Sequence, residues 1–132
     1  MFGVYKYEVS VDENGNPLNG NKQYKCHLPS NIPVKEFWSI LVFDCKTNLL
    51  IKTVQSWPSI NSKMKNLSYC EDGSLDIYFG PKAPDGKENN WIQTLPRKKW
   101  RMVVNLYDPL ESWINNTWKP GKIEEIKSTD LI

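Results

Sequence analysis

The sequence predicts a mainly β protein, an antiparallel β-sandwich with one short helix near the C-terminus. Short runs in which apolar and polar residues alternate predict the strands, because successive side chains of a strand point to opposite faces of a sheet. Turn signals separate these runs at short intervals, a spacing typical of sandwiches and barrels. The signals are Asn14-Gly15, Asn19-Gly20, Asp72-Gly73, Asp85-Gly86 and Pro120-Gly121.

Four alternating runs predict four strands, each with its apolar residues on one face and its polar residues facing water. In chain order the apolar sets are Tyr5, Tyr7, Val9 and Val11; Tyr24, Cys26 and Leu28; Leu75, Ile77 and Phe79; and Trp100, Met102, Val104 and Leu106. Asp72-Gly73 lies between "LSYC" and "SLDIYF". It predicts a type I′ hairpin turn, which needs positive φ at both central residues.

A fifth run, Phe37–Phe43 with the sequence FWSILVF, is apolar at nearly every position. A strand with this pattern is expected in the middle of a sheet that is covered on both faces. The covering layer would come from a neighbouring subunit or another domain.

One short helix is predicted after the last alternating run. Asp108 is the expected N-cap, Pro109 the first helical residue, and Glu111 completes a capping box. The apolar face would hold Leu110, Trp113, Ile114 and Thr117, at i, i+3, i+4 and i+7. We expect one domain over residues 1–132, in which residues 120–132 form a polar, frayed tail.

Charge and hydropathy exclude several classes of protein. The net charge of +2 is too small to indicate a nucleic-acid or anionic-membrane partner. The basic stretch 97–101 is interpreted as a turn leading into a strand rather than a phosphate-binding patch. No apolar run approaches the roughly 18 residues of a membrane span, and the N-terminus lacks a signal-peptide pattern. The expected location is therefore cytoplasmic, without a membrane partner.

Nucleophiles and metal ligands are few. His27 is the single histidine and falls on the polar face of its strand, so no metal site or cofactor is predicted. Ser59 has no nucleophile-elbow glycines and is expected to cap a turn after Pro58. The thiols are widely spaced and are interpreted as reduced core residues. They are Cys26, Cys45 and Cys70.

Carboxylates are the remaining catalytic candidates, but their spacing identifies no acid–base pair. The candidates are Glu71, Asp72, Asp76, Asp85 and Glu88. Catalytic residues therefore stay unassigned, and whether the protein is an enzyme stays open.

The segment 80–91, GPKAPDGKENNW, is the best candidate for a binding site. Its Gly, Pro and Asn residues fix unusual backbone angles and would present Asn89, Asn90 and Trp91, with Asp76 on the preceding strand. Amide and aromatic groups together suit a carbohydrate or another small polar ligand. In the alternative interpretation the segment is a corner of the sheet, and Trp91 covers the edge of the sandwich.

Several segments resemble the family called domain of unknown function 1214. They include PVKEFWS, DGSLDIYFGPKAPDGKENNWIQT and YDPLESWINNTWKPG, and the resemblance extends from about Asn14 to Glu124. It implies a β-sandwich, jelly-roll-like module that usually lies behind the domain of unknown function 1254. It implies no reaction and no catalytic residue.

We therefore expect a non-catalytic module that binds an upstream domain or a second copy of itself. Without the upstream domain apolar surface would be exposed, with Phe37, Trp38 and the Trp113–Trp118 region as candidates. The alternatives are a binder of a small polar ligand or carbohydrate, and part of a hydrolase-like enzyme whose site needs the upstream domain.

Overall fold

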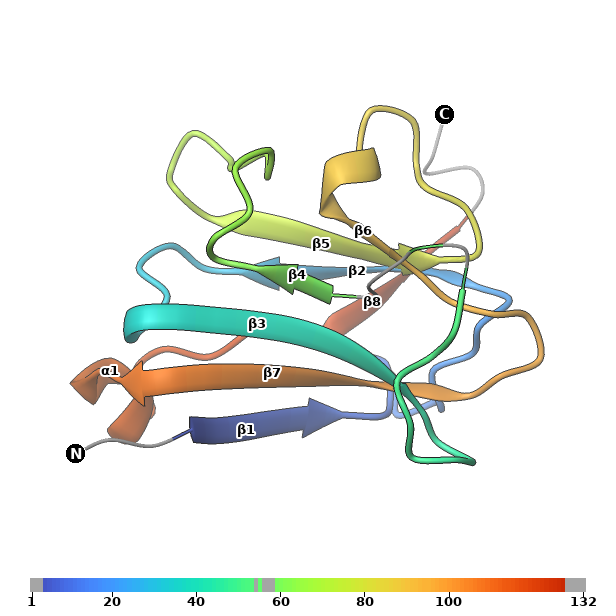
Figure 1. Ribbon diagram of the computed structural model, residues 1–132, viewed down its shortest axis with the longest axis horizontal. Helices are drawn as coiled ribbons and strands as arrows, with labels where there is room; N and C mark the ends of the chain where they lie inside the picture. Colours follow the sequence, from blue (N-terminus) through green and yellow to red (C-terminus); the bar gives the residue numbers. More distant parts are fainter. Residues whose placement is uncertain (1–3, 54, 56–58, 128–132) are drawn as a thin grey trace.

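Two four-stranded sheets face each other in the computed structural model, which describes residues 4–53, 55 and 59–127 (Figure 1). The first sheet has the order β1-β7-β3-β4, formed by Val4–Val9, Trp100–Pro109, Val34–Asp44 and Ser59–Asn61. The second has the order β6-β5-β2-β8, formed by Trp91–Gln93, Leu75–Gly80, Gln23–Leu28 and Ile123–Ile126. The short helices are η1, Glu88–Asn90, and α1, Glu111–Ile114.

The core lies between the sheets and confirms the predicted β-sandwich. The apolar residues of the alternating runs in β2, β5 and β7 are buried there. Trp100 is fully buried, with its ring centroid 4.8 Å from that of Phe79 and 5.6 Å from that of Tyr24. One alternating set from each run thus forms the inner face of its sheet.

The apolar run Phe37–Phe43 lies in β3, between β7 and β4, as expected for a central strand. Its inner face is buried, including Ile40 and Val42. On the outer face Phe37, Leu41 and Phe43 are only half-buried, so the cover expected from a neighbouring subunit or another domain stays a prediction.

Three short strands were not predicted, because three or four residues are too few to show a period. β6 pairs with β5 in parallel, so the second sheet is mixed. β4 contains Ser59, which is therefore a strand residue and not a turn cap; Pro58 lies outside the described residues. β8 occupies part of the segment that we expected to be frayed, and its Ile123 is buried.

The predicted helix is shorter and begins later than expected. Pro109 belongs to β7 and pairs with Val34, while Asp108 has a φ of 52°. The N-cap is Leu110, whose side chain makes no capping hydrogen bond. Leu110 and Ile114 are exposed, so the predicted apolar face does not form. Pairing of β7 with β3 outweighs the local capping signal here.

The turn at Asp72-Gly73 forms, but not as type I′. Gly73 has a φ of 85°, whereas Asp72 is not among the described residues with positive φ. The Gly73 amide donates to the Cys70 carbonyl at 3.0 Å, and the Cys70 amide donates to the Ser74 carbonyl at 2.8 Å. One left-handed glycine with these bonds is typical of a type I turn followed by a G1 bulge.

The helices in the described part of the chain are all too short and too polar to cross a lipid bilayer.

Candidate functional site

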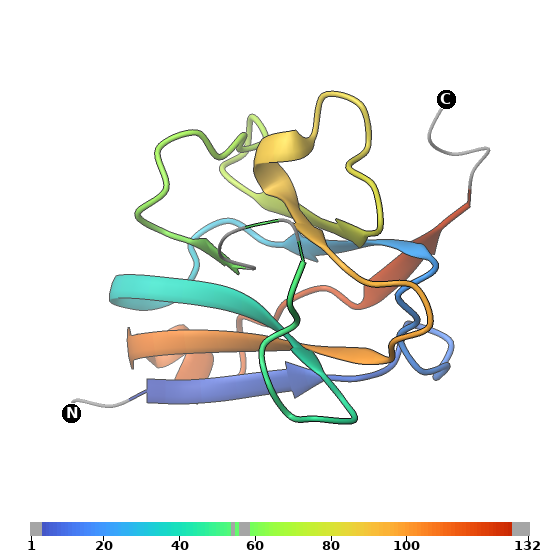
Figure 2. The ribbon, with the colours of Figure 1, turned by 45° about the vertical axis from the view of Figure 1, so that its right-hand side comes forward.

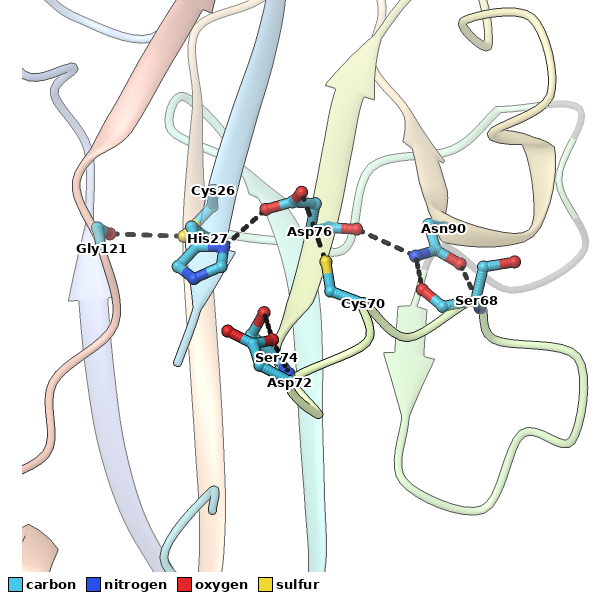
Figure 3. A network of polar contacts seen from close by, with 9 residues as sticks. All are labelled: Cys26, His27, Ser68, Cys70, Asp72, Ser74, Asp76, Asn90 and Gly121. Atoms are coloured by element: carbon cyan, nitrogen blue, oxygen red, sulfur yellow. Dashed lines mark hydrogen bonds and ion pairs between the residues drawn. The ribbon is translucent and has the colours of Figure 1, made fainter. Parts of the chain in front are cut away.

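A polar network surrounds Asp76 on the outer face of β2 and β5 (Figure 3). Its Oδ1 lies 2.7 Å from Nδ1 of His27, because the two residues are direct partners in the β2–β5 register. Its Oδ2 lies 3.9 Å from Sγ of Cys70, a weak contact. Cys70 and Cys45 are exposed, so the prediction that the thiols are core residues is wrong for both and holds for Cys26. His27 is thus on the polar face, as predicted, and Asp76 already has a partner within the chain.

This network has only part of what nucleophilic catalysis requires. Such catalysis needs a base in hydrogen-bond contact with the nucleophile. Here the thiol of Cys70 contacts Asp76, and His27 is also held by Asp76. Over residues 4–53, 55 and 59–127, no group of three or more His, Cys, Asp and Glu side chains is arranged to hold a metal ion.

The neighbouring turn holds a second carboxylate firmly. Oδ1 of Asp72 accepts hydrogen bonds from the hydroxyl and the amide of Ser74. These bonds lower the pKa of Asp72, because they favour its charged form. Asp72 therefore stabilises the turn that leads into β5.

Asn90, one of the predicted ligand-binding residues, is buried and serves the framework. Its Nδ2 donates to the carbonyls of Ser68 at 2.9 Å and Asp76 at 3.0 Å, and its Oδ1 accepts from the Ser68 amide at 2.9 Å. The structure thus brings Asn90 and Asp76 together, but through the main chain of Asp76. Asn90 fixes the 68–70 segment and η1 against β5.

Asn89 and Trp91 lie elsewhere, at a shallow hollow of about 310 Å³ between β4 and β6. The indole of Trp91 is half-buried and donates to the carbonyl of Gly80 at 3.0 Å. The side chain of Gln55 bridges the Trp91 carbonyl and the Gln93 amide, at 3.1 and 2.7 Å. Trp91 therefore covers an edge of the sandwich, and Asn89 is exposed beside it.

A second hollow of about 330 Å³ lies over the outer face of β2, β5 and β8. Its floor holds Lys25, Tyr78 and Glu124, because Lys25 pairs with each of the other two in the strand registers. The 84–87 segment adds Asp85 and Lys87 to the rim. Burial raises the pKa of Tyr78, and Asp76 adds to the effect, so the phenol is a hydrogen-bond donor at neutral pH.

Sequence reasoning missed this second hollow. Alternation places Lys25 and Tyr78 on the outer face of their strands, which is a usable signal. Glu124, however, comes from a strand that was not predicted. Only the pairing of β8 with β2 brings it beside Lys25.

The outer face of the first sheet is apolar over part of its area. We call Phe37, Leu41, Phe43 and Tyr107, together with the buried Val103, the β3–β7 face. The hydrogen-bonded pair Ser39 and Asn105 lies between Phe37 and Leu41 on the same face. The Phe37 and Tyr107 ring centroids lie 5.2 Å apart. Cations cover two of the rings: Lys63 lies 5.4 Å from the Phe37 centroid, and Arg101 lies 5.0 Å from the Phe43 centroid.

Phe37 is the one predicted association residue on this face. Trp38 points into the core and is 4% exposed. Trp113 packs edge-on against Tyr7, with centroids 5.9 Å apart. Trp118 is buried, and its Nε1 donates to the carbonyls of Pro29 and Ser30. These tryptophans therefore stabilise the chain itself.

The family model described as Protein of unknown function (DUF1214) matches residues 3–111. Comparison with curated proteins gives no match. Two solved structures share the fold at low sequence identity, which supports a common fold and nothing about function.

The first is the VPA0106 protein from Vibrio parahaemolyticus, with a TM-score of 0.79 and 19% identity over 94% of this chain and 31% of that chain. The second is an uncharacterized protein from Burkholderia cenocepacia, with a TM-score of 0.54 and 16% identity over 92% of this chain and 35% of that chain. The chain thus spans about a third of each.

Proposed function

The chain belongs to the DUF1214 family of proteins of unknown function, and from this premise we propose that it is a non-catalytic module that docks onto another polypeptide domain through the β3–β7 face. The observation that carries the proposal is the half-buried apolar surface of Phe37, Leu41 and Phe43 on a central strand. Strands in the middle of a sheet are normally covered when both faces are apolar.

The proposed partner is a domain of the kind that accompanies this module in longer chains. The two similar structures have chains of which this module matches only 31% and 35%. Additional polypeptide is therefore available there to cover such a face. An interdomain surface of this kind combines apolar contacts with polar ones.

Charge indicates what the partner surface should carry. Lys63 and Arg101 lie over the rings of Phe37 and Phe43. A partner with aliphatic side chains at its centre and carboxylates at its rim would bury the rings and pair with both cations. Such complementary charges favour the correct partner and its orientation.

The test titrates the chain with a separately expressed domain of unknown function 1254 from the same genome, by isothermal titration calorimetry. We expect measurable binding and a loss of about tenfold or more in affinity for Leu41→Lys, because a charge then lies at the centre of the apolar face. Ile126→Lys makes the same change on the opposite sheet and should leave affinity unchanged. Absence of binding by the wild type, or equal affinity of Leu41→Lys, would contradict the proposal.

A second candidate is the binding of a small polar ligand, favoured by the hollow with Lys25, Tyr78 and Glu124 on its floor. Charges of both signs beside a phenol suit a sugar or a zwitterionic metabolite. A ligand that binds only the folded chain raises its melting temperature. Tyr78→Phe should abolish the shift if this hollow is the site, whereas Asn89→Ala should abolish it if the ligand lies beside Trp91. A panel of sugars and amino acids that gives no shift would reject this candidate.

A further inference from the structure

We propose that β1 pairs with β1 of a second copy of the chain, antiparallel, with Tyr7 on the two-fold axis. The sheet β1-β7-β3-β4 then continues from one protomer into its partner. This association uses the edge of the sheet, whereas the proposed function uses its outer face, so each can fail without the other.

β1 has a neighbouring strand on one side only within the described part of the chain. β1 is the terminal strand of its sheet, and both views show it at the border of the molecule (Figures 1 and 2). It pairs with β7 from Val4 to Val9 without a register shift. β1 contains no proline or bulge, and its edge is protected only by its charges, Lys6 and Glu8, which repel a second strand unless the charges on that strand are complementary.

Geometry allows only a few registers in which a two-fold axis relates the two β1 strands. Residues that lie opposite each other in an antiparallel pair point to the same face. Lys6 and Glu8 point outward, whereas Tyr7 and Val9 pack on the core side. A continuous sheet therefore requires a two-fold axis at a residue, which within the middle of β1 means Lys6, Tyr7 or Glu8.

Charge selects one of these three registers. An axis at Lys6 places two lysines opposite each other, and an axis at Glu8 places two glutamates opposite each other; both arrangements are destabilising. An axis at Tyr7 places Lys6 opposite the partner's Glu8, and Glu8 opposite the partner's Lys6. The sequence of the strand is thus complementary to itself in the Tyr7 register alone.

Lys6 is available for this pairing, whereas Glu8 already has an ion-pair contact within the chain. Lys6 is exposed and makes no ion pair among the described residues. Glu8 is 54% exposed and lies 3.7 Å from Nε of Arg101 on β7. In the dimer Glu8 therefore lies between Arg101 and the partner's Lys6.

A hollow on the inner side of β1, with apolar and charged residues in its lining, provides a second reason for pairing. Its volume is about 330 Å³; Tyr7, Val9, Val11 and Ile123 form its apolar part, and Asp12, Glu13 and Lys122 add charges to the lining. Pairing at Tyr7 places the partner's Tyr5 opposite Val9, at the rim of that space. The pairing therefore covers apolar surface as well as main-chain groups.

Analytical ultracentrifugation of the full chain tests the association. We expect a concentration-dependent dimer, and about tenfold weaker dimerisation for Lys6→Glu or Glu8→Lys, because two symmetric attractive pairs become repulsive. An equimolar mixture of the two variants should dimerise again, since their strands are complementary. Lys35→Glu, an equal charge change on β3, is the control and should leave dimerisation unchanged. A monomer at all concentrations, or no recovery in the mixture, would overturn the proposal.

Disulfide trapping tests the register, in a Cys45→Ser/Cys70→Ser background that removes the exposed thiols. A mixture of Lys6→Cys and Glu8→Cys chains should cross-link on oxidation, whereas neither variant should do so alone, because directly opposite Cβ atoms lie about 5 Å apart. Cross-linking of Lys6→Cys alone would place the axis at Lys6 and overturn the register. The same result for Glu8→Cys would place it at Glu8.

Discussion

Asn89 and Asn90 are chemically identical neighbours, yet the structure gives them different roles. Asn89 is exposed at the hollow beside Trp91. Asn90 is 3% exposed, and its amide bonds to the main chain of two separate segments. The turn of η1 rotates one side chain outward and the next inward. A buried amide with main-chain partners is expensive to remove, because each partner would be left unsatisfied.

Asn90→Ala should lower the free energy of unfolding by about 2–3 kcal/mol, since the Ser68 amide and the carbonyls of Ser68 and Asp76 lose their partner. Urea unfolding followed by circular dichroism measures the change. Asn89→Ala is the matched control and should change it by less than about 0.5 kcal/mol. Equal effects of the two substitutions would refute the structural role of Asn90.

Because of Cys26, the free energy of unfolding should fall as the pH becomes alkaline. Burial raises its pKa from 9.0 to about 12 in the folded chain. The stability that the protonated Cys26 thiol contributes is therefore complete below pH 9 and is lost as pH rises toward 12. The reason is that the thiol of the unfolded chain releases its proton at a lower pH than that of the folded chain. Guanidinium unfolding should show the stability difference between wild type and Cys26→Ala shrinking from pH 8 to pH 10. A difference that stays constant with pH would contradict this assignment.

At the scale of elements, local signals failed where pairing between distant segments decided the structure. The capping signal at Asp108 and Pro109 predicted a longer helix, but β7 continues to Pro109 because it pairs with β3. The polar segment after Pro120 predicted fraying, but β8 pairs with β2 and buries Ile123. In both places the tertiary partner outweighs the local preference.

Replacing one isoleucine in β8 and one in α1 should show that β8 is packed in the core and α1 is not. Ile123→Ala should destabilise the chain by about 2–4 kcal/mol, because Ile123 is 1% exposed in the core. Ile114→Ala should change stability by less than about 0.5 kcal/mol, because Ile114 is 63% exposed on α1. Thermal or urea unfolding measures both. A large loss of stability with Ile114→Ala would instead support the amphipathic helix that the sequence predicted.

At the scale of the whole molecule, each sheet joins segments that are far apart in the chain. β1 pairs with β7, and β2 pairs with both β5 and β8. The buried residues of both sheets form one core cluster. Neither half of the chain contains a complete sheet, so neither half has a core of its own.

One cooperative unfolding transition is therefore expected, as for a single domain over residues 1–132. Tryptophan fluorescence and far-ultraviolet circular dichroism should give the same midpoint in urea. Trp100 reports on the packing between the sheets, because it contacts Phe79 and Tyr24. Two separated transitions would show that part of the chain folds independently.

Alternation along β2, β5 and β7 was sufficient to predict their inner faces and the sandwich, because a period of two is a local property of each strand. It also placed His27, Lys25 and Asp76 on the outer face. The sequence alone therefore determined the fold class and which side chains of β2, β5 and β7 face away from the core.

Register between strands decided the rest. It brings His27 to Asp76, sets Lys25 between Tyr78 and Glu124, and turns Asn90 away from the surface. Registers depend on contacts between residues that are distant in the chain, and no local pattern encodes them. The apolar run of β3 could be recognised as a central strand, but only the assembled sheets show that its outer face stays half-exposed.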